Sequence, residues 1–379
     1  MAVMAPSDSG IAVFSLGCPD GRFPSLGARH APAIRLERSI ADLFGLRPED
    51  APDTRPWLDH GRWGIGHPLA SGGGAAPADT AYPFLPAEGP GLHQIPVGPI
   101  HAGIIEPGHF RLTVNGETVV RLEPRLGYAH KGIDGLMTGA PIDRAAKLAG
   151  RVSGDSTVAY ALAFARATEA ALEAEVPPRA AYLRALMAEV ERLAHHLGDI
   201  GAVCNDASFG LLQAHFAVLR EQVLRAAHSC FGHRLMRDRI LPGGVAADLD
   251  GSGAAVLRDL ATFIETRLAA LVEIYDETAS LQDRTVGTGI LAPALARRFG
   301  AGGYVGRASG HEADARKTPG YAPYPALRFD VPMLEAGDVN ARVWIRIREV
   351  EQSLSLLRQI LDALPAGDIF TEVRASGRI

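Results

Sequence analysis

"RAAYLRALMAEVERLAHHLGDIG", residues 179–201, carries the clearest structural pattern in this chain. Apolar residues recur every three or four positions and form one stripe, which predicts a long helix with one buried face. The stripe consists of Leu183, Leu186, Met187, Val190, Leu193 and Leu197. Glu189 and Arg192 lie beside it. A helix of this kind indicates a mainly helical protein.

Other stretches repeat the helical pattern: residues 33–46, about 253–283, and 340–364. In residues 340–364, apolar residues alternate at steps of four and three: Val343, Ile347, Val350, Leu354, Leu357, Leu361 and Leu364. That spacing also occurs in coiled coils, but a length of about three heptads favours a helix inside an intramolecular bundle.

Residues 109–122, "HFRLTVNGETVVRL", alternate apolar and polar side chains around Asn115-Gly116, which predicts a β-hairpin. We therefore expect an α+β chain that is mainly α, with a helical bundle core and a small antiparallel β region toward the N-terminal side. We expect three parts: loop-rich residues 1–70, a Gly/Pro/Ala linker over 71–91, and a main domain over 92–379.

Composition excludes several classes of function. The 379 residues, 47% apolar and 21% charged, can bury a large core. The net charge of −5 gives no sign of a basic surface that would bind nucleic acid or a membrane. Cys18, Cys204 and Cys230 are too far apart for a CxxC pair, which suggests a reducing, cytosolic setting. No apolar run approaches the ~18 residues of a transmembrane segment, so membrane contact is expected through partners.

Polar residues gather where "KLAGRVSGDSTVAYALAFA", residues 147–165, turns into a helix. "GDST" at 154–157 looks like the nucleophile block of a GDSL-type hydrolase, but the chain has no Asp-x-x-His to supply the base. The simpler interpretation is that Ser153, Asp155 and Ser156 cap the amides of a helix that starts near Ser156, a contribution of ~1 kcal/mol. A Gly-x-Gly-x-x-Ala match at 286–292 follows no strand, which disfavours a nucleotide fold.

His101, Glu106 and His109 stand in the Gly/Pro-rich stretch "IPVGPIHAGIIEPGHFRL", residues 95–112. Glu and His at this density suit proton handling. A solvated loop explains the same residues equally well, and the local sequence leaves both interpretations open.

Several motifs occur in the order found in one superfamily: "GPIHAGIIEPGHFRL", "LGYAHKGID", "EVERLAHHLGDIG", "LPGGV", "GRASGHEADARK" and "FDVPMLEAGDVNARVWIRIREVEQSL". Over roughly residues 92–365 the chain resembles nickel-iron hydrogenase large subunits of the membrane-bound, formate-hydrogenlyase type. It equally resembles the homologous quinone-site subunit of respiratory complex I. Residues 19–67 resemble the tail of complex I's small hydrophilic subunit, which is fused ahead of this one in formate-hydrogenlyase enzymes.

The resemblance implies a metal-free version of the hydrogenase site. Where such hydrogenases have Arg-x-Cys-Gly-x-Cys, whose thiolates ligate the nickel-iron centre, this chain has "RVSGDS" at residues 151–156. Serine hydroxyls are poor ligands for a centre that demands thiolates. The family's second cysteine pair lies near the C-terminus, and this chain reaches Ile379 before any such motif. Either the chain is a fragment or that segment has been lost, and we expect no metal here.

The complex I resemblance implies further roles. The quinone-contacting histidine corresponds to His101 or His109, whereas the quinone-contacting tyrosine falls near Gly150 and is missing. The histidine that approaches the terminal iron-sulfur cluster falls near Met236, and the cluster-side arginine near Lys147, which keeps the charge without the planar fork.

Glu106 matches a proton-relay glutamate of the hydrogenases, a role that requires a carboxylate in a secluded site. The expected catalytic residues are Glu106, His109, His101, Arg151 and Asp155, and the expected cofactor-binding residues are Lys147, Ser153, Ser156 and Arg237. Ser153 and Ser156 are expected at a helix N-terminus that faces the loop with Glu106 and His109.

The expected function is that of a core subunit in a membrane-associated oxidoreductase complex with a vacant nickel-iron site. It would couple electron transfer from a partner's iron-sulfur cluster to quinone or to proton movement, with NAD(H) bound elsewhere in the complex. The expected partners are an iron-sulfur small subunit and membrane-arm subunits, and the expected location is cytoplasmic, peripheral on the inner face of the membrane. An active quinone reductase of NADH-dehydrogenase type and a purely structural subunit are the alternatives.

Overall fold

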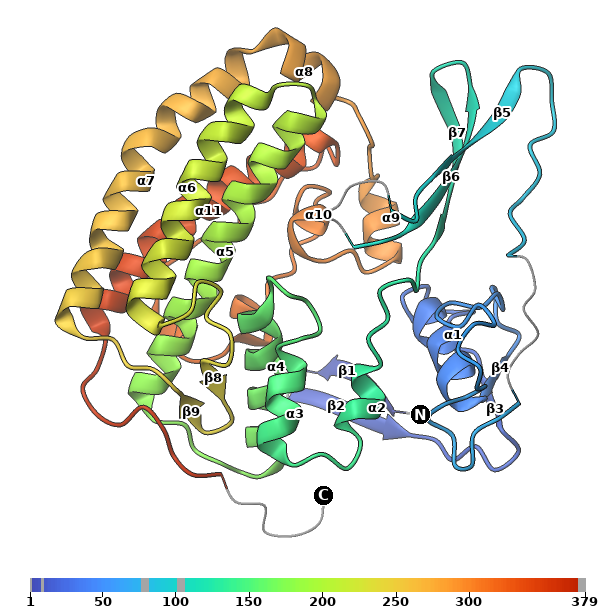
Figure 1. Cartoon of the computed structure of the whole chain (residues 1–379), viewed down its shortest axis with the longest axis horizontal. Helices are drawn as coiled ribbons and strands as arrows, with labels where there is room; N and C mark the ends of the chain where they lie inside the picture. Colours follow the sequence, from blue (N-terminus) through green and yellow to red (C-terminus); the bar gives the residue numbers. More distant parts are fainter. Residues whose placement is uncertain (1, 8–9, 76–81, 101–105, 374–379) are drawn as a thin grey trace. The chain divides into compact units, whose positions relative to one another are not determined.

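The computed structural model describes residues 2–7, 10–75, 82–100 and 106–373. The chain forms two compact units, residues 1–135 and 136–379 (Figure 1). The first unit holds most of the strands and the second most of the helices. The prediction of a mainly helical α+β protein is therefore confirmed.

Four long helices make the core of the second unit (Figure 1). They are α5 (Pro178–Asp206), α6 (Gly210–Phe231), α7 (Gly251–Glu277) and α11 (Val339–Ala363). Helices α5 and α7 each contact both α6 and α11, so the four close into a bundle. The predicted stripe of α5 is at most 1% exposed, and the α11 stripe is buried except at Leu364. An intramolecular bundle, rather than a coiled coil, accounts for both patterns.

The predicted helical stretch over about 253–283 is confirmed, but it is divided into two helices. Two helices, α7 and α8 (Ala279–Thr285), meet at Thr278, whose backbone is extended with ψ 96°. The Thr278 hydroxyl donates to the carbonyl of Ile274 at 2.5 Å, and the Gln282 side chain donates to the carbonyl of Tyr275 at 2.8 Å. Side chains therefore satisfy the carbonyls at the end of α7 in place of a continuing helical ladder.

Helices α3 (Ile142–Ala149) and α4 (Thr157–Ala171) pack against each other, and α4 also contacts α5. The short strands β8 (Ile240–Leu241) and β9 (Gly244–Val245) form a two-stranded sheet around the LPGGV motif. Shorter elements lead back to α11: α9 (Pro293–Arg298), α10 (Gly303–Arg307), η1 (Arg316–Gly320) and η2 (Tyr324–Ala326). They supply one side of the site described below.

A buried ion pair holds the LPGGV hairpin. The Arg184 guanidinium donates to both carboxylate oxygens of Glu169, at 2.5 and 3.0 Å, and to the carbonyls of Leu241 and Gly244. Glu169 also accepts the amide of Gly243 at 2.7 Å. Residues 369–371 then run alongside this hairpin, since the Thr371 amide donates to the Gly243 carbonyl at 2.9 Å. A Cβ atom at Gly243 would lie 2.1 Å from the carbonyl oxygen of Thr371, so only glycine permits this approach.

The predicted hairpin is confirmed in the first unit. Strands β6 (His109–Asn115) and β7 (Thr118–Arg125) are antiparallel, with Asn115 paired to Thr118 and Gly116 at φ 58° in the turn. A third strand, β5 (Leu92–Val97), pairs with the outer side of β6. The sequence did not predict β5, because Pro96 interrupts its pattern; proline is tolerated on such an edge strand.

The rest of the first unit consists of short elements. Helix α1 (Ala33–Phe44) confirms the predicted helix over 33–46. The strands pair as β1 (Ala2–Ser7) with β2 (Gly10–Ser15), antiparallel, and β3 (Arg22–Pro24) with β4 (Arg47–Glu49), parallel. Helix α2 (Ile133–Met137) follows the three-stranded sheet.

Two predictions about the organisation of the chain can be set beside the structure. The described residues of the predicted linker, 71–75 and 82–91, contain no helix and no strand apart from the bridge that Gly74 makes to Gly66. The compact units nevertheless divide after Gly135, and the three predicted domain assignments stay predictions. Within the described ranges, every helix is too short or too polar to cross a membrane.

Candidate functional site

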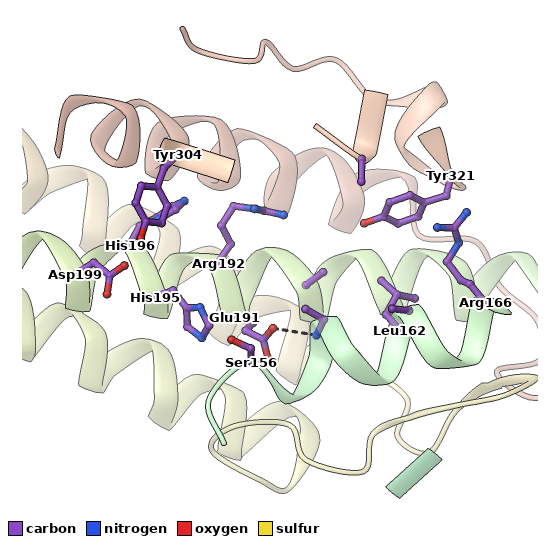
Figure 2. Close-up of a pocket in the computed structure, with 14 residues that line it drawn as sticks. Ser156, Leu162, Arg166, Glu191, Arg192, His195, His196, Asp199, Tyr304 and Tyr321 are labelled. Atoms are coloured by element: carbon purple, nitrogen blue, oxygen red, sulfur yellow. Dashed lines mark hydrogen bonds between the residues drawn. The ribbon is translucent and has the colours of Figure 1, made fainter. Parts of the chain in front are cut away.

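The N-terminus of α4 is capped by a side chain from another helix. The carboxylate of Glu191 on α5 accepts hydrogen bonds from the backbone amides of Val158 and Ala159 at 2.7 and 3.0 Å, and Figure 2 shows the second of these bonds as a dashed line. Ser156 precedes α4 but makes no side-chain cap, and the Ser153 hydroxyl donates to Asp155 at 3.1 Å instead. The predicted serine caps are therefore wrong. One carboxylate satisfies two orphan amides with charge-assisted hydrogen bonds, which a single hydroxyl cannot do.

Glu191 is a buried carboxyl group that titrates near neutrality. Its side chain is enclosed between α4 and α5, with the residue 7% exposed. Burial raises the pKa of Glu191 to about 7, although the two amides and His195 act in the opposite direction. His195, one turn further along α5, contacts the carbonyl of Asp155 through Nε2 at 3.0 Å. At the N-terminus of α4 a carboxyl group with a pKa of about 7 therefore lies near an imidazole.

The predicted residues Lys147, Arg151 and Arg237 come together around Asp238. Arg151 donates to both oxygens of Asp238, at 2.7 Å each, and to the carbonyl of Lys147 at 3.3 Å. Hydrogen bonding from Arg151 lowers the pKa of Asp238, and the charges of Lys147 and Arg237 act in the same direction. Met236 precedes this group in a left-handed backbone conformation, φ 52°. The loop after α6 is thus fixed against the turn between α3 and α4.

A pocket of about 350 Å³ lies between α4, α5 and the residues around α10 and η1. Ser156 is the predicted site residue that lines it, while Lys147, Ser153, Asp155, Arg151 and Arg237 do not. Its other polar groups include Glu191, Arg192, His195, His196 and Tyr321, as Figure 2 shows. This size falls at the lower end of the range for small-molecule sites.

Glu189, which contacts the pocket-lining Arg192, is the centre of a buried ionic network. Its carboxylate accepts hydrogen bonds from Tyr324 and Ser353, each at 2.6 Å, and from Arg316 at 3.0 Å and Arg192 at 3.2 Å. Burial alone would raise the pKa of Glu189, but the two guanidinium groups and two hydroxyls lower it to about 2. Glu189 is therefore ionised at every physiological pH.

The network continues to a second carboxylate on α11. Glu349 accepts from His196 Nε2 at 2.6 Å and pairs with Arg307 at 2.5 Å. Burial lowers the pKa of His196, although Glu349 opposes the shift, so the imidazole is neutral and donates its Nε2 proton to an ionised Glu349. Arg316 also pairs with Asp314 at 2.6 Å, which brings the segment before η1 into the same network.

Sequence reasoning missed several of these residues. Glu191, His195 and His196 lie inside the motif at 189–201, and a run of charged residues and histidines beside a buried stripe was the available signal. Tyr324 and Arg316 lie more than a hundred residues from Glu189 and carried no local signal.

Two predicted residues lie in the first unit. Glu106 is exposed and pairs with Lys131 at 2.9 Å. His109 opens β6 half-buried, with its ring 5.2 Å from that of Phe84. His101 falls outside the described residues. The catalytic roles of all three residues, and the predicted contact between their loop and Ser156, stay predictions.

The described residues provide no metal centre of the usual kind. They contain no group of three or more His, Cys, Asp or Glu side chains placed to hold a metal ion. Burial raises the pKa of Cys204 and of Cys230 to about 11, so both are protonated thiols at neutral pH.

Comparison with known sequences shows that the chain is similar to two groups of proteins. Residues 209–377 match the family described as "Respiratory-chain NADH dehydrogenase, 49 Kd subunit" and residues 10–72 match "Respiratory-chain NADH dehydrogenase, 30 Kd subunit". Formate hydrogenlyase subunit 5 of Escherichia coli is 33% identical over 360 residues, which cover 92% of this chain. Those residues are 63% of that relative's length, so the chain spans less than two thirds of it.

Two further relatives are covered more fully. The carbon monoxide-induced hydrogenase of Rhodospirillum rubrum is 34% identical over 73% of this chain and 76% of its own length. NADH-quinone oxidoreductase subunit 4 of Thermus thermophilus is 32% identical over 72% of this chain and 67% of its own length. The same sequence thus resembles hydrogenase subunits and quinone oxidoreductase subunits to a similar degree.

Proposed function

Because this chain belongs to the family that contains the 49 kDa subunit of respiratory-chain NADH dehydrogenase and the hydrogenase subunits named above, we propose that it is a core subunit of a membrane-associated oxidoreductase complex. In this proposal it couples electron transfer from a partner's iron-sulfur cluster to proton movement. The observation that supports this role best is the buried Glu191 carboxyl group at the mouth of α4.

The side chains before the N-terminus of α4 do not suit a nickel-iron centre as metal ligands. Ser153 and Ser156 offer neutral hydroxyls at the two positions where the resemblance leads us to expect cysteines, and the Ser153 hydroxyl is already bonded to Asp155. Neutral alcohols neither donate strongly to a soft metal centre nor lose their protons easily. No step of the proposed function therefore passes through nickel or iron at this position.

Proton exchange suits the groups that are present. Glu191 and His195 both line the pocket, and both contact the turn before α4 or its first amides. A group with a pKa near the working pH exchanges protons without a large energy penalty in either direction. A charge change on a cluster nearby would shift this pKa, because charges interact strongly in a site of low dielectric constant. Electron transfer in the partner would then drive proton uptake at Glu191.

The remaining partners follow from the same family membership. We infer an iron-sulfur small subunit and membrane-arm subunits as partners, with the complex peripheral on the inner face of the membrane. A quinone is the proposed alternative electron acceptor at this subunit, and NAD(H) is assigned to the wider complex. The match of residues 10–72 to the 30 kDa subunit supports an assembly of complex I type. A structural subunit is the second candidate, favoured by the rigid network around Glu189.

Redox titration of the purified complex tests the proton role. We expect stepwise electrochemical reduction of the partner clusters to be accompanied by proton uptake that is largest near pH 7, detected with an indicator dye. Glu191→Gln keeps the size of the side chain but cannot be deprotonated, so it should abolish this component. Glu351→Gln, at an exposed position on α11, serves as the matched control. Equal uptake in all three proteins would favour the structural subunit.

Elemental analysis of the same complex tests the vacant site. Purified from nickel-supplied cells with its native partners, the complex is expected to hold no nickel in this chain. Ser153→Cys with Ser156→Cys should not restore it, because four thiolates are expected for the family's centre and the chain's own cysteines, at 18, 204 and 230, are scattered. Stoichiometric nickel assigned to this subunit would contradict the proposal.

A further inference from the structure

Glu191 and His195 lie between two cavities. Both residues line the pocket of about 350 Å³ described above, and both also line a second cavity of about 10 Å³. The second cavity lies toward α6 and the loop that follows it, where Ala227 and Met236 form part of its lining. A space of this size holds about one water molecule. The two residues therefore form part of the wall of both cavities.

One turn of α5 separates Glu191 from His195. Residues four positions apart lie on the same face of a helix, with their Cβ atoms roughly 5–6 Å apart. Figure 2 shows the imidazole of His195 next to the carboxyl group of Glu191. The charge of His195 also acts on Glu191 and lowers its pKa, against the larger effect of burial. A proton can therefore pass between the two groups directly or through one water molecule.

A hydrogen bond to the backbone sets the protonation of the His195 ring. Its Nε2 atom lies 3.0 Å from the carbonyl oxygen of Asp155. A carbonyl oxygen can only accept, so Nε2 carries the proton of the neutral ring and Nδ1 holds a lone pair. The ring can take up a second proton at Nδ1 and release it from the same atom, while Nε2 keeps its contact with Asp155.

Few other groups along the two cavities can carry a proton. Arg192, Arg220 and Arg234 line one cavity or the other, but guanidinium groups keep their protons at every physiological pH. His196 lines the first pocket, but it is 6% exposed and its Nε2 already donates to a carboxylate. Imidazole is the side chain that exchanges protons most readily near neutral pH, which leaves His195 as the best suited group.

We propose that His195 is the relay through which protons from the second cavity reach Glu191. This inference rests on the proposed function, because it requires proton uptake at Glu191. In the first step, Nδ1 of His195 takes a proton from a water molecule in the second cavity, which is supplied from solvent at the exposed Asp155. In the second step, the imidazolium gives this proton to the Glu191 carboxylate. One proton has then moved from solvent to Glu191, and His195 is neutral again.

The rate of proton uptake by the purified complex tests the relay. A light pulse with a photosensitiser reduces the partner clusters, and an indicator dye follows proton uptake at pH 7. His195→Gln can keep a hydrogen bond to Asp155 but cannot carry a proton, so uptake should be at least about tenfold slower and reach nearly the same final amplitude. His215→Gln, at an exposed position on α6, is the matched control and should keep the wild-type rate.

Added imidazole distinguishes a lost relay from a damaged site. His195→Ala leaves a space at a half-buried position, into which imidazole from solution can enter. Imidazole should therefore raise the uptake rate of His195→Ala toward that of the wild type, in proportion to its concentration. The wild type and His215→Gln should not respond. A purely structural role of His195 would not give this pattern.

The outcomes separate this inference from the proposed function. A wild-type complex that takes up no protons near pH 7 contradicts both. An unchanged uptake rate in His195→Gln overturns the relay and leaves the proposed function standing. Loss of the final amplitude in His195→Gln, or no response of His195→Ala to imidazole, also overturns the relay, because His195 would then hold the site in shape rather than carry the proton.

Discussion

Glu189→Ala is expected to lower the free energy of unfolding by about 3–5 kcal/mol, the usual cost of breaking a buried ion pair from one side. The substitution removes the shared partner of Arg192, Arg316, Tyr324 and Ser353. Arg316 is 3% exposed, and among the described residues it would keep Asp314 as its one ionic partner. Its charge would remain buried with too few acceptors. Urea denaturation at neutral pH, followed by circular dichroism, measures the loss.

Two comparisons make this result specific. Glu351→Ala, exposed on α11, should change stability by less than about 0.5 kcal/mol. Glu189→Gln removes the charge but keeps the shape, and its deficit relative to the wild type should shrink as the pH falls from about 4.5 toward 2. The lowered pKa of Glu189, about 2, means that its ionised form stabilises the fold above the unfolded pKa and is lost by protonation below it. A pH-independent deficit would contradict the ionised network.

Glu191→Gln is expected to change the pH dependence of stability in the opposite direction. The folded-state pKa of Glu191 is raised from 4.5 to about 7, so the folded protein holds a proton that the unfolded chain has already released. Wild-type stability should therefore fall as the pH rises from about 4.5 to 7, by an amount on the order of 3 kcal/mol from this group. Glutamine mimics the protonated side chain and should lack this decline.

Denaturation midpoints measured from pH 5 to pH 8 test this expectation. The stability of Glu191→Gln minus that of the wild type should become more favourable to the variant as the pH rises from 5 to about 7, and should level off above pH 7. Glu351→Gln serves as the matched control for removing a carboxylate at an exposed site. Parallel curves for Glu191→Gln and the wild type would show that Glu191 ionises normally in the folded protein, which would also remove the basis for its proton role.

Local patterns determined the secondary structure of the bundle. The apolar stripes of α5 and α11 repeat at helical spacing, and such a face must be buried wherever the helix packs. The hairpin of β6 and β7 follows from alternation around a turn that accepts positive φ at Gly116. The order of the motifs also indicated the family. All of these depend on residues close together in the chain.

Contacts between distant residues decided the site. Glu191 rather than Ser156 caps α4, because the fold brings a carboxylate 33 residues away to the first amides. Ser353, 164 residues from Glu189, and Tyr324, 135 residues away, complete one network on that carboxylate. A hydrogen bond depends on where a group is placed in space, and a pKa depends on the burial and charges around it. Helical periodicity therefore predicted which face of α5 is buried, but only the packing of α4, α5, α11 and the segment around η1 made Glu189 a permanent anion and Glu191 a group that titrates near neutral pH.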